Sequence, residues 1–284
     1  MLRSLLDHPL TRGLDIDDPR TTQLRREIIQ EKGFLRRIYQ EWYSAIAGAL
    51  PQSIGPIVEL GSGAGFVKDF VPHLITSEIF YCPEVDVVLS GLDLPFAAAS
   101  LRGIVLVEVL HHLPLPRRFF IEASRCVQPG GIVAMIEPWV TSWSRLVYSR
   151  LHHEPFNPEA EEWEFPASGP LSGANGALPY IIFVRDRLQF EREFPMWEIK
   201  TIKPMMPFCY LVAGGISMRS LMPGWSFKCW RALEDMLRPV MNNLAMFAYI
   251  VLQKKSMNTV SSVKTRPTPV TQQAPGNQGL NKKN

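Results

Sequence analysis

A glycine-rich loop is the feature of the sequence that most constrains the fold. Gly61, Gly63 and Gly65 follow directly on the apolar run Ile57–Leu60. Glycine adopts positive φ angles without a steric penalty and lets a ligand lie directly against the backbone. The next residues, Val67–Leu74, are predicted to form a helix, whose first N–H groups and positive dipole end favour an anionic group. The sequence therefore predicts a strand, a ligand-binding loop and a helix in succession.

Short apolar runs alternate with helix-like segments from Pro56 onward. The predicted strands are Ile57–Leu60, Ile75–Phe80, Val85–Leu89, Gly103–Val109, Ile132–Ile136, Trp197–Lys203 and Ala245–Gln253. The predicted helices among them include Arg117–Val127, Tyr180–Phe194 and Trp225–Leu237. Strands that alternate with helices at this spacing form a parallel sheet through right-handed crossovers. We therefore predict an α/β protein with a Rossmann-like, seven-stranded, mostly parallel sheet, helices on both faces and an N-terminal helical extension.

Composition divides the chain into three zones. Residues 1–50 are predicted to form a helical lid, because apolar residues recur at helical spacing, with Gly33 as a break. Residues 51–255 form the predicted Rossmann-like domain, with an insertion rich in Trp, Pro and Gly at about 138–180. Residues 256–284 lack an apolar period and are predicted to be a disordered tail.

Charge and hydropathy restrict the classes of partner. The formal net charge of +3 resides in residues 256–284, which contain four basic residues and no acidic one, so no basic face for nucleic acid is predicted. The four cysteines are widely spaced and predict free thiols in a reducing compartment. The longest nearly uncharged apolar stretch, Met205–Met218, is shorter than the roughly 20 residues of a membrane-spanning helix. We predict a cytoplasmic protein without an integral membrane segment, and peripheral membrane contact stays open.

The glycine loop belongs to a longer ordered set of motifs. An acid-x-Gly-x-Gly-x-Gly pattern runs from Glu59 to Gly65, and Phe66 stands where a dinucleotide-binding loop has its last glycine. Further motifs follow in order at Leu94-Pro95-Phe96, Leu110-His111-His112 and Pro129-Gly130-Gly131. Together they resemble the class I S-adenosylmethionine-dependent methyltransferases, in particular the type 11 methyltransferases. The resemblance covers roughly residues 56–140 and implies S-adenosyl-L-methionine as the cofactor.

The resemblance also implies a set of cofactor-binding residues. They are Glu59, Gly61, Ser62, Gly63, Gly65, Glu78, Ser90 and Leu94. Loop amides meet the methionine carboxylate, acidic or carbonyl oxygens meet its ammonium group, and Glu78 accepts hydrogen bonds from both ribose hydroxyls. Ser90 stands where many related enzymes carry an aspartate that contacts the adenine amino group. The candidates for that contact are therefore the Ser90 hydroxyl, a backbone group and Asp93.

Catalytic candidates follow the fourth and fifth predicted strands, because ligands of open α/β sheets lie beyond the carboxyl ends of the strands. His112 is predicted to act as a general base or to orient the acceptor, since imidazole titrates near neutral pH. His111 and Glu137 are the other two candidates. No metal site is predicted, because these residues and His152-His153-Glu154 follow no fixed metal-ligand spacing and only folding would bring them together.

Apolar and aromatic segments are candidates for the acceptor site. Tyr39, Trp42 and Tyr43 end the N-terminal helical zone, where they either flank the cofactor mouth or pack a helix on the sheet. Residues 138–180 and Met205–Met218 are expected to set acceptor specificity. Their hydrophobicity indicates a sizeable or lipid-linked acceptor, although core packing explains it equally well.

We therefore predict an S-adenosylmethionine-dependent methyltransferase that transfers a methyl group to an O or N atom of a small or lipid-linked molecule. One alternative is a non-catalytic S-adenosylmethionine-binding module, which the departure at Ser90 leaves open. Another is a Rossmann-fold oxidoreductase, against which Phe66 argues. The lack of a basic patch argues against an RNA-modifying enzyme.

Overall fold

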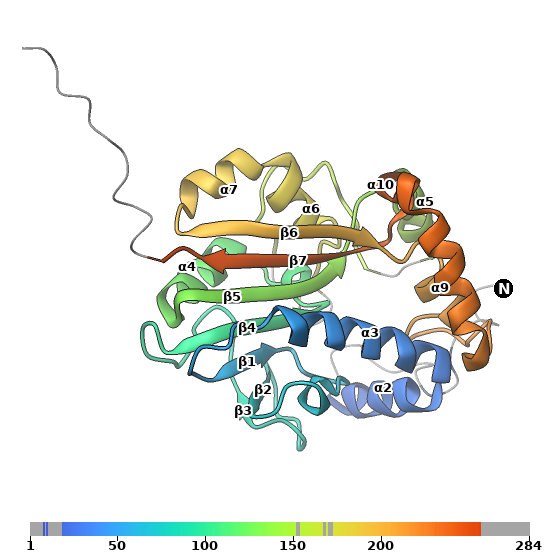
Figure 1. Ribbon diagram of the computed structural model, residues 1–284, viewed down its shortest axis with the longest axis horizontal. Helices are drawn as coiled ribbons and strands as arrows, with labels where there is room; N and C mark the ends of the chain where they lie inside the picture. The colour runs from blue at the N-terminus through green and yellow to red at the C-terminus, as the bar shows by residue number, and fades with distance from the viewer. Residues whose placement is uncertain are drawn as a thin grey trace, which may run out of the picture.

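A seven-stranded sheet in the order β3-β2-β1-β4-β5-β7-β6 forms the centre of the molecule (Figure 1). The computed structural model describes His8, Leu10 and residues 19–151, 154–166, 169 and 173–256. The strands are β1 (Ile57–Leu60), β2 (Leu74–Glu78), β3 (Val87–Val88), β4 (Leu101–Val107), β5 (Val127–Pro138), β6 (Trp197–Met205) and β7 (Phe247–Lys254). Neighbours from β3 to β5 pair in parallel, whereas β7 runs antiparallel to both β5 and β6. The predicted Rossmann-like, mostly parallel sheet is confirmed.

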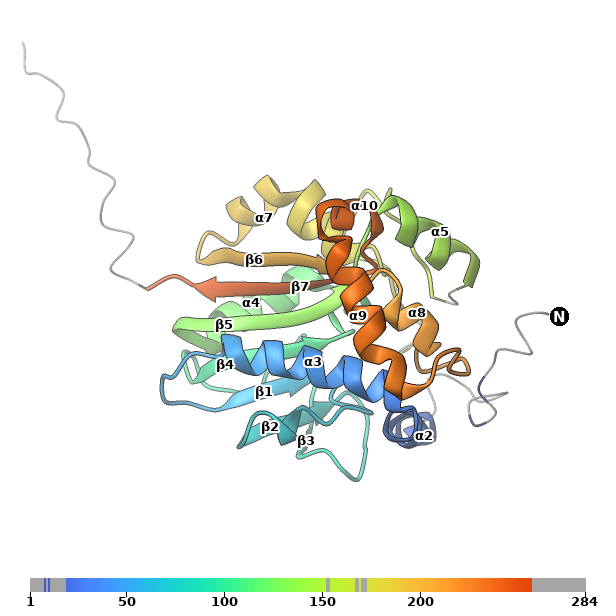
Figure 2. The ribbon, with the colours of Figure 1, turned by 45° about the vertical axis from the view of Figure 1, so that its right-hand side comes forward.

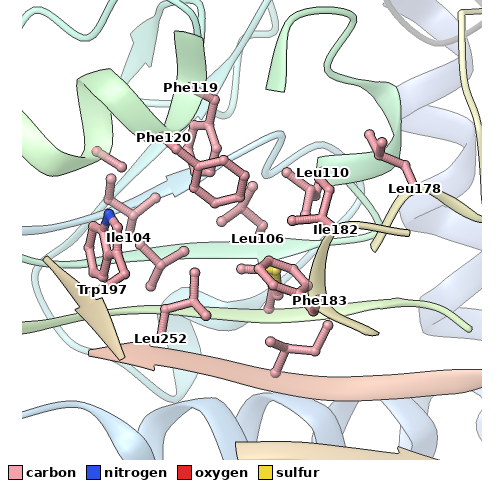
Figure 3. Close-up of a cluster of buried hydrophobic side chains, with 14 of the residues drawn as sticks. Ile104, Leu106, Leu110, Phe119, Phe120, Leu178, Ile182, Phe183, Trp197 and Leu252 are labelled. Atoms are coloured by element: carbon pink, nitrogen blue, oxygen red, sulfur yellow. The ribbon is translucent and has the colours of Figure 1, made fainter. Parts of the chain in front are cut away.

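Both faces of the sheet are buried. Successive residues of a strand point to opposite faces, and in β4 Ile104 and Leu106 belong to one buried cluster while Val105 belongs to the other. Figure 3 shows the first cluster, in which Phe120 and Phe183 lie over the side chains of the sheet. A parallel sheet buried on both faces requires nearly continuous apolar strands, which is the pattern that the sequence shows.

Helices cover the two faces and gather at one end of the sheet. The face with Phe120 carries α4 (Pro116–Cys126), α6 (Leu178–Tyr180), the π-helical turn Ile181–Arg185 and α7 (Arg187–Glu193). The opposite face carries α3 (Gly33–Ala49), which follows α2 (Pro19–Glu31) and crosses the front of the sheet in Figure 1. Toward the carboxyl ends of the parallel strands lie α5 (Ser142–Leu151), α8 (Cys209–Ala213), α9 (Phe227–Met236) and α10 (Met241–Leu244) (Figure 2). Single 3-10 turns occupy Val67–Asp69, Leu110–His112, Gly224–Ser226 and Arg238–Val240.

The two N-terminal helices meet at a buried lysine. α2 ends at Glu31 and α3 begins at Gly33, which confirms the predicted break. The ammonium group of Lys32 donates hydrogen bonds to the carbonyl oxygens of Gly215 and Met218. Burial lowers the pKa of Lys32 to about 8. Lys32 thus connects the N-terminal helices to the segment that follows α8.

The segment between β6 and β7, residues 206–246, is a second insertion beside the predicted one. Arg231 of α9 donates to both carboxylate oxygens of Glu41 in α3, at 2.9 and 2.6 Å. Arg231 also pairs with the fully buried Glu234, which accepts hydrogen bonds from the first N–H groups of α8. These charge-assisted contacts hold α8 and α9 against α3.

The prediction of a helix over Val67–Leu74 is wrong. Only a 3-10 turn ending at Asp69 follows the glycine loop. Pro72 cannot donate a backbone hydrogen bond, and His73 adopts a φ of 62°, so the chain reverses directly into β2. The corresponding face of the sheet is covered by α3 instead.

Two other predicted elements differ in their limits. β5 begins at Val127 rather than Ile132, with a register shift opposite Leu101 and Gly103 in β4. The helix predicted over Tyr180–Phe194 divides into α6, a π-helical turn and α7. Among the described residues, every helix falls short of the length and apolarity that crossing a bilayer requires. Apart from Ser256, the predicted tail lies outside the described residues.

The packing of Phe120 gives a direct test of this core. Its ring is fully buried and lies 5.1 Å from Phe190, with the ring planes nearly perpendicular. We expect Phe120→Ala to lower the free energy of unfolding by about 3–5 kcal/mol, because it removes buried apolar surface and leaves a cavity. Urea denaturation measures the change. Leu188→Ala, at a side chain that is 80% exposed, is the matched control and should change stability by less than about 0.5 kcal/mol.

Candidate active site

A cavity of about 640 Å³ opens at the carboxyl ends of β1, β2 and β4. Its lining comes from the glycine loop, the residues that follow β2 and β4, helices α2, α3 and α5, and the segment after α8. Ligands of open α/β sheets bind at this edge. The volume lies within the range of small-molecule sites.

The glycine loop follows β1 and closes against the turn after β4. Gly61 and Gly63 have φ angles of 62° and 36°, in the region that side chains rarely adopt. A Cβ atom on Gly61 would lie 2.6 Å from Cγ2 of Val109, so no side chain fits there. Glycine at position 61 is therefore required both by the backbone conformation and by the close approach of the turn.

Ser62 joins the loop to the neighbouring strand. Its N–H donates to the carbonyl oxygen of Ser77 at 2.8 Å, and its hydroxyl accepts from the N–H of Ser77 at 3.0 Å. On the other side, a Cβ atom on Gly65 would lie 2.6 Å from Oη of Tyr43. Phe66 packs edge-on against the Tyr43 ring, with centroids 4.9 Å apart. The loop is thus held rigidly between β2 and α3, with its backbone along the cavity.

Two buried carboxyl groups line the cavity beside the loop. Burial raises the pKa of Glu59 to about 8, and the nearby Glu78 contributes to the shift. Burial also raises the pKa of Glu78. A Cβ atom on Gly63 would lie 2.9 Å from Oε1 of Glu78, so this carboxyl group faces the loop. A cationic ligand stabilises the charged form of such groups, and a molecule with ammonium and sulfonium groups therefore fits this part of the cavity.

The segment after β3 contributes Ser90 but not Leu94. Ser90 lines the cavity, and its hydroxyl accepts a hydrogen bond from the N–H of Leu92 at 3.1 Å. The expectation for Leu94 is corrected, because its side chain is buried in the core and does not line the cavity. Its N–H donates to Glu122 of α4, which turns this residue toward the helix. Leu92 lines the cavity in its place.

Glu137, at the end of β5, organises the turn after β4. One carboxylate oxygen accepts hydrogen bonds from the N–H groups of Val109 and Leu110, at 3.0 and 2.7 Å. The other oxygen lies 2.7 Å from Nδ1 of His111. Glu137 is fully buried and does not line the cavity, so its predicted catalytic role is corrected to a positioning role.

The two histidines have opposite protonation behaviour. Burial alone would lower the pKa of His111, but hydrogen bonds to Glu137 and Glu154 raise it to about 10. Burial and the adjacent His111 lower the pKa of His112 to about 3. Nδ1 of His112 lies 3.1 Å from the carbonyl oxygen of Gly173, which can only accept, so Nδ1 carries the proton. A pKa near 3 makes His112 a weak base at neutral pH and argues against the predicted base role.

Glu108 is a site residue that the sequence reasoning missed. It follows β4 directly, lines the cavity and has a φ of 57°. Its carboxyl oxygens accept hydrogen bonds from the hydroxyls of Tyr39 and Tyr210, at 3.1 and 3.4 Å. Burial raises the pKa of Glu108 to about 7. In the sequence analysis, this acid lay inside the predicted strand Gly103–Val109. An acidic residue near the end of an apolar run could have identified it as a site residue.

The N-terminal helices supply a further part of the lining. Tyr39 and Tyr43 line the cavity, whereas Trp42 is buried and stacks on Tyr210 with centroids 5.8 Å apart. Arg25 of α2 also lines the cavity and was not predicted. The two segments expected to form the acceptor site both reach the cavity. Residues 138–180 contribute Val147, Tyr148, Leu151 and Glu154, and the stretch Met205–Met218 contributes Tyr210–Leu211 and Gly214–Met218.

Comparison with known proteins gives matches to methyltransferases. Residues 59–135 match the family model of a methyltransferase domain, type 11. No curated protein matches the sequence. Among solved structures, a chain in the complex of the Haloferax volcanii Trm112 methyltransferase activator with a protein designated a methyltransferase has a TM-score of 0.50 and 13% identity, covering 85% of this chain and 98% of that one.

Two other solved structures extend over similar lengths. A methyltransferase from Thermotoga maritima has 16% identity and a TM-score of 0.48, over 82% of this chain and 99% of that one. The geranyl diphosphate C-methyltransferase of Streptomyces coelicolor A3(2) has 14% identity and a TM-score of 0.47, over 88% and 92% of the two chains. At 13% identity and a TM-score of 0.50, the similarity to the Haloferax volcanii chain indicates a shared fold only.

The strand order, the glycine loop with its two buried acids and the matched segment together define a class I S-adenosylmethionine-dependent methyltransferase. The chain is an enzyme of this class, similar to the type 11 methyltransferases, and S-adenosyl-L-methionine is its cofactor. The structure also argues against an oxidoreductase. Within the described part of the chain no regular helix begins at the loop, and a dinucleotide diphosphate needs the N–H groups of such a helix start.

The requirement for glycine at position 61 can be tested by a substitution that adds a single methyl group. We expect Gly61→Ala to weaken binding of S-adenosylhomocysteine about tenfold or more, because alanine is strained at this φ and its Cβ displaces Val109. Isothermal titration calorimetry measures the affinity. Gly48→Ala is the matched control, since a Cβ at this position in α3 meets nothing within 4 Å. Equal affinities for the two variants would contradict the loop assignment.

The raised pKa of Glu59 predicts a pH dependence of cofactor binding. With a pKa of about 8, Glu59 is mostly protonated at pH 6 and must release its proton to meet an ammonium group. The affinity for S-adenosylhomocysteine should therefore rise several-fold between pH 6 and pH 8. Glu59→Gln removes this titration and should flatten the profile, leaving only the contribution of Glu78. An unchanged slope in the variant would show that Glu59 does not meet the cation.

Proposed function

We propose that the enzyme transfers a methyl group to an oxygen or nitrogen atom of a small or lipid-linked acceptor, with oxygen favoured. The observation that carries this proposal is the carboxyl group of Glu108, held in the cavity between two tyrosine hydroxyls. An alcohol or phenol must lose its proton to become a good nucleophile. Glu108 is a half-buried carboxyl group that can accept this proton.

Residues around the glycine loop hold the cofactor in this proposal. Backbone N–H groups of the glycine loop meet its carboxylate, apart from those of Ser62 and Gly65, which already donate to carbonyl oxygens of the protein. Glu59 meets its ammonium group. Glu78 accepts hydrogen bonds from the ribose hydroxyls, as its position against the loop allows. Ser90 lies beyond, at the adenine end, where its hydroxyl already accepts a hydrogen bond from a backbone N–H. The adenine contact is then available from the second lone pair of this hydroxyl and from backbone groups of the segment after β3.

When bound, S-adenosylmethionine supplies a methyl group on a sulfonium, whose transfer to an acceptor lone pair breaks the carbon–sulfur bond and leaves a neutral thioether. The residues of the chain prepare the acceptor. Tyr39 and Tyr210 orient the carboxylate of Glu108, and this carboxylate takes the proton from the acceptor. A pKa of about 7 places this base near the working pH. Burial excludes competing water.

The acceptor half of the cavity is largely apolar. Its side chains include Val147, Leu151, Leu211, Ile216, Met218, Met246 and Phe247. Apolar walls around a polar end fit an amphipathic acceptor whose reactive group is polar. The carboxyl groups of Glu108 and Glu154 in the same half disfavour phosphates, and hence a nucleic acid acceptor.

The α2–α3 region acts as a lid in this proposal. Arg25 and Tyr39 line the cavity from these helices, while Lys32 ties them to the segment after α8. The lid, the Rossmann-like domain and its insertions thus enclose one site.

Glu108→Gln tests the proposed base. Transfer of labelled methyl groups from S-adenosylmethionine to apolar alcohols, phenols and amines, and to a lipid extract, identifies an acceptor. We then expect Glu108→Gln to lower kcat by about 10²–10⁴-fold with an oxygen acceptor, since the amide cannot take the proton. Binding of S-adenosylhomocysteine should stay unchanged. Glu191→Gln, at a half-exposed ion pair of α7, is the control. Undiminished turnover in Glu108→Gln would overturn the base assignment.

A further inference from the structure

Three side chains converge at the acceptor end of the cavity. His111 and His112 lie in the turn after β4, and Glu154 follows α5. Their nitrogen and oxygen atoms lie within 4.8 Å of one another. Nε2 of His111 is 3.4 Å from one carboxylate oxygen of Glu154, and Nε2 of His112 is 3.9 Å from the other. All three residues line the cavity.

The Nδ1 atom of each imidazole, on the side away from Glu154, has a hydrogen-bond partner that fixes the orientation of the ring. Nδ1 of His111 lies 2.7 Å from the fully buried Glu137, and Nδ1 of His112 lies 3.1 Å from the carbonyl oxygen of Gly173. Both partners accept from Nδ1, so both Nε2 atoms point toward Glu154. A carboxylate or carbonyl group behind each imidazole is the usual support of histidines that bind a metal ion, because it fixes the ring and increases the basicity of the ligating nitrogen.

The spacing fits a small divalent ion. Metal–ligand bonds of about 2.0–2.1 Å in tetrahedral geometry place two ligand atoms about 3.3 Å apart. The separations of 3.4 and 3.9 Å from Nε2 of each histidine to Glu154 are close to this value. Glu154 presents one carboxylate oxygen to each imidazole, and one ligand atom from each of the three residues lies within 4.8 Å of the other two.

We propose that His111, His112 and Glu154 bind a divalent transition-metal ion such as Zn²⁺. Two imidazoles and one carboxylate suit such ions better than Mg²⁺ or Ca²⁺, which prefer oxygen ligands. Binding of the ion requires both Nε2 atoms to be unprotonated. The sequence predicts no metal site because Glu154 lies 42 positions beyond His112 and only the fold brings the three residues together.

Three protein ligands leave a coordination position toward the cavity. Resting on the proposed function, we assign this position to the acceptor oxygen, whose proton a divalent ion makes more acidic. Glu108 then remains the group that takes the proton. Binding of the metal itself does not depend on the acceptor, so it can be tested separately.

Metal binding is measured on the full-length, tag-free chain after treatment with a chelator. Titration with Zn²⁺, followed by calorimetry and by mass-spectrometric metal analysis, should give one ion per chain. Co²⁺ should show visible absorption bands of a low-coordinate site without a thiolate charge-transfer band. Glu154→Gln and His112→Gln should each weaken binding by about 100-fold or more, given that loss of a supporting group alone costs 10–100-fold. Circular dichroism verifies that each variant is folded.

Two variants serve as matched controls. Cys229→Ser removes an exposed thiol, and His73→Asn removes an exposed imidazole at a left-handed backbone position that asparagine tolerates. Both should bind Zn²⁺ as the unmodified chain does. Absence of stoichiometric binding to the unmodified chain would overturn the proposal. So would equal affinity in folded Glu154→Gln and His112→Gln. Metal binding without methyl transfer to any oxygen or nitrogen acceptor would instead support the site and contradict the proposed function.

Discussion

The carboxylate of Glu137 is the contact on which the site depends. It leaves the end of β5 and accepts hydrogen bonds from two backbone N–H groups of the turn after β4 and from His111. A fully buried carboxylate is costly unless several donors surround it, so the two strand ends are held together. The same turn brings Val109 against Gly61 and points the imidazole of His111 into the cavity. One side chain outside the cavity thereby sets the relation between the cofactor loop and the acceptor side.

The sheet supplies the frame for these contacts. Its parallel strands end at a common edge, and burial of both faces leaves that edge as the place where polar groups meet a ligand. Among the described residues, four acids line the cavity there, of which Glu59 and Glu78 lie at the loop and Glu108 and Glu154 on the acceptor side. An acid-rich, partly desolvated cavity favours a cationic methyl donor at one end and proton removal at the other. The two insertions and α2–α3 close this edge.

Sequence patterns predicted which residues line the cavity at the glycine loop better than which residues line its opposite side. The positions of Gly61, Gly63 and Glu78 follow from local sequence, because the loop and the two strands that flank it are close in the chain. Leu94 was predicted to line the cavity and does not. The pattern of apolar and polar residues in the segment after β3 does not show which side chains face the cavity. Glu108 was missed because an apolar run concealed that β4 ends at Val107. The prediction of a helix after the glycine loop was wrong because α3, which is distant in sequence, covers that part of the sheet.

The sequence by itself determined the seven-stranded, mostly parallel sheet and the presence of a nucleoside-binding loop, because these depend on periodicity and on glycines within short stretches. The order of the strands came from the structure. Tertiary structure alone decided how the titratable groups behave. His111 and His112 are adjacent in sequence, yet one lies between two carboxylates and the other faces a carbonyl group, so their pKa values move in opposite directions. The physical reason is that desolvation and charge pairing depend on neighbours such as Glu137, Glu154 and Gly173, which only folding brings to the site.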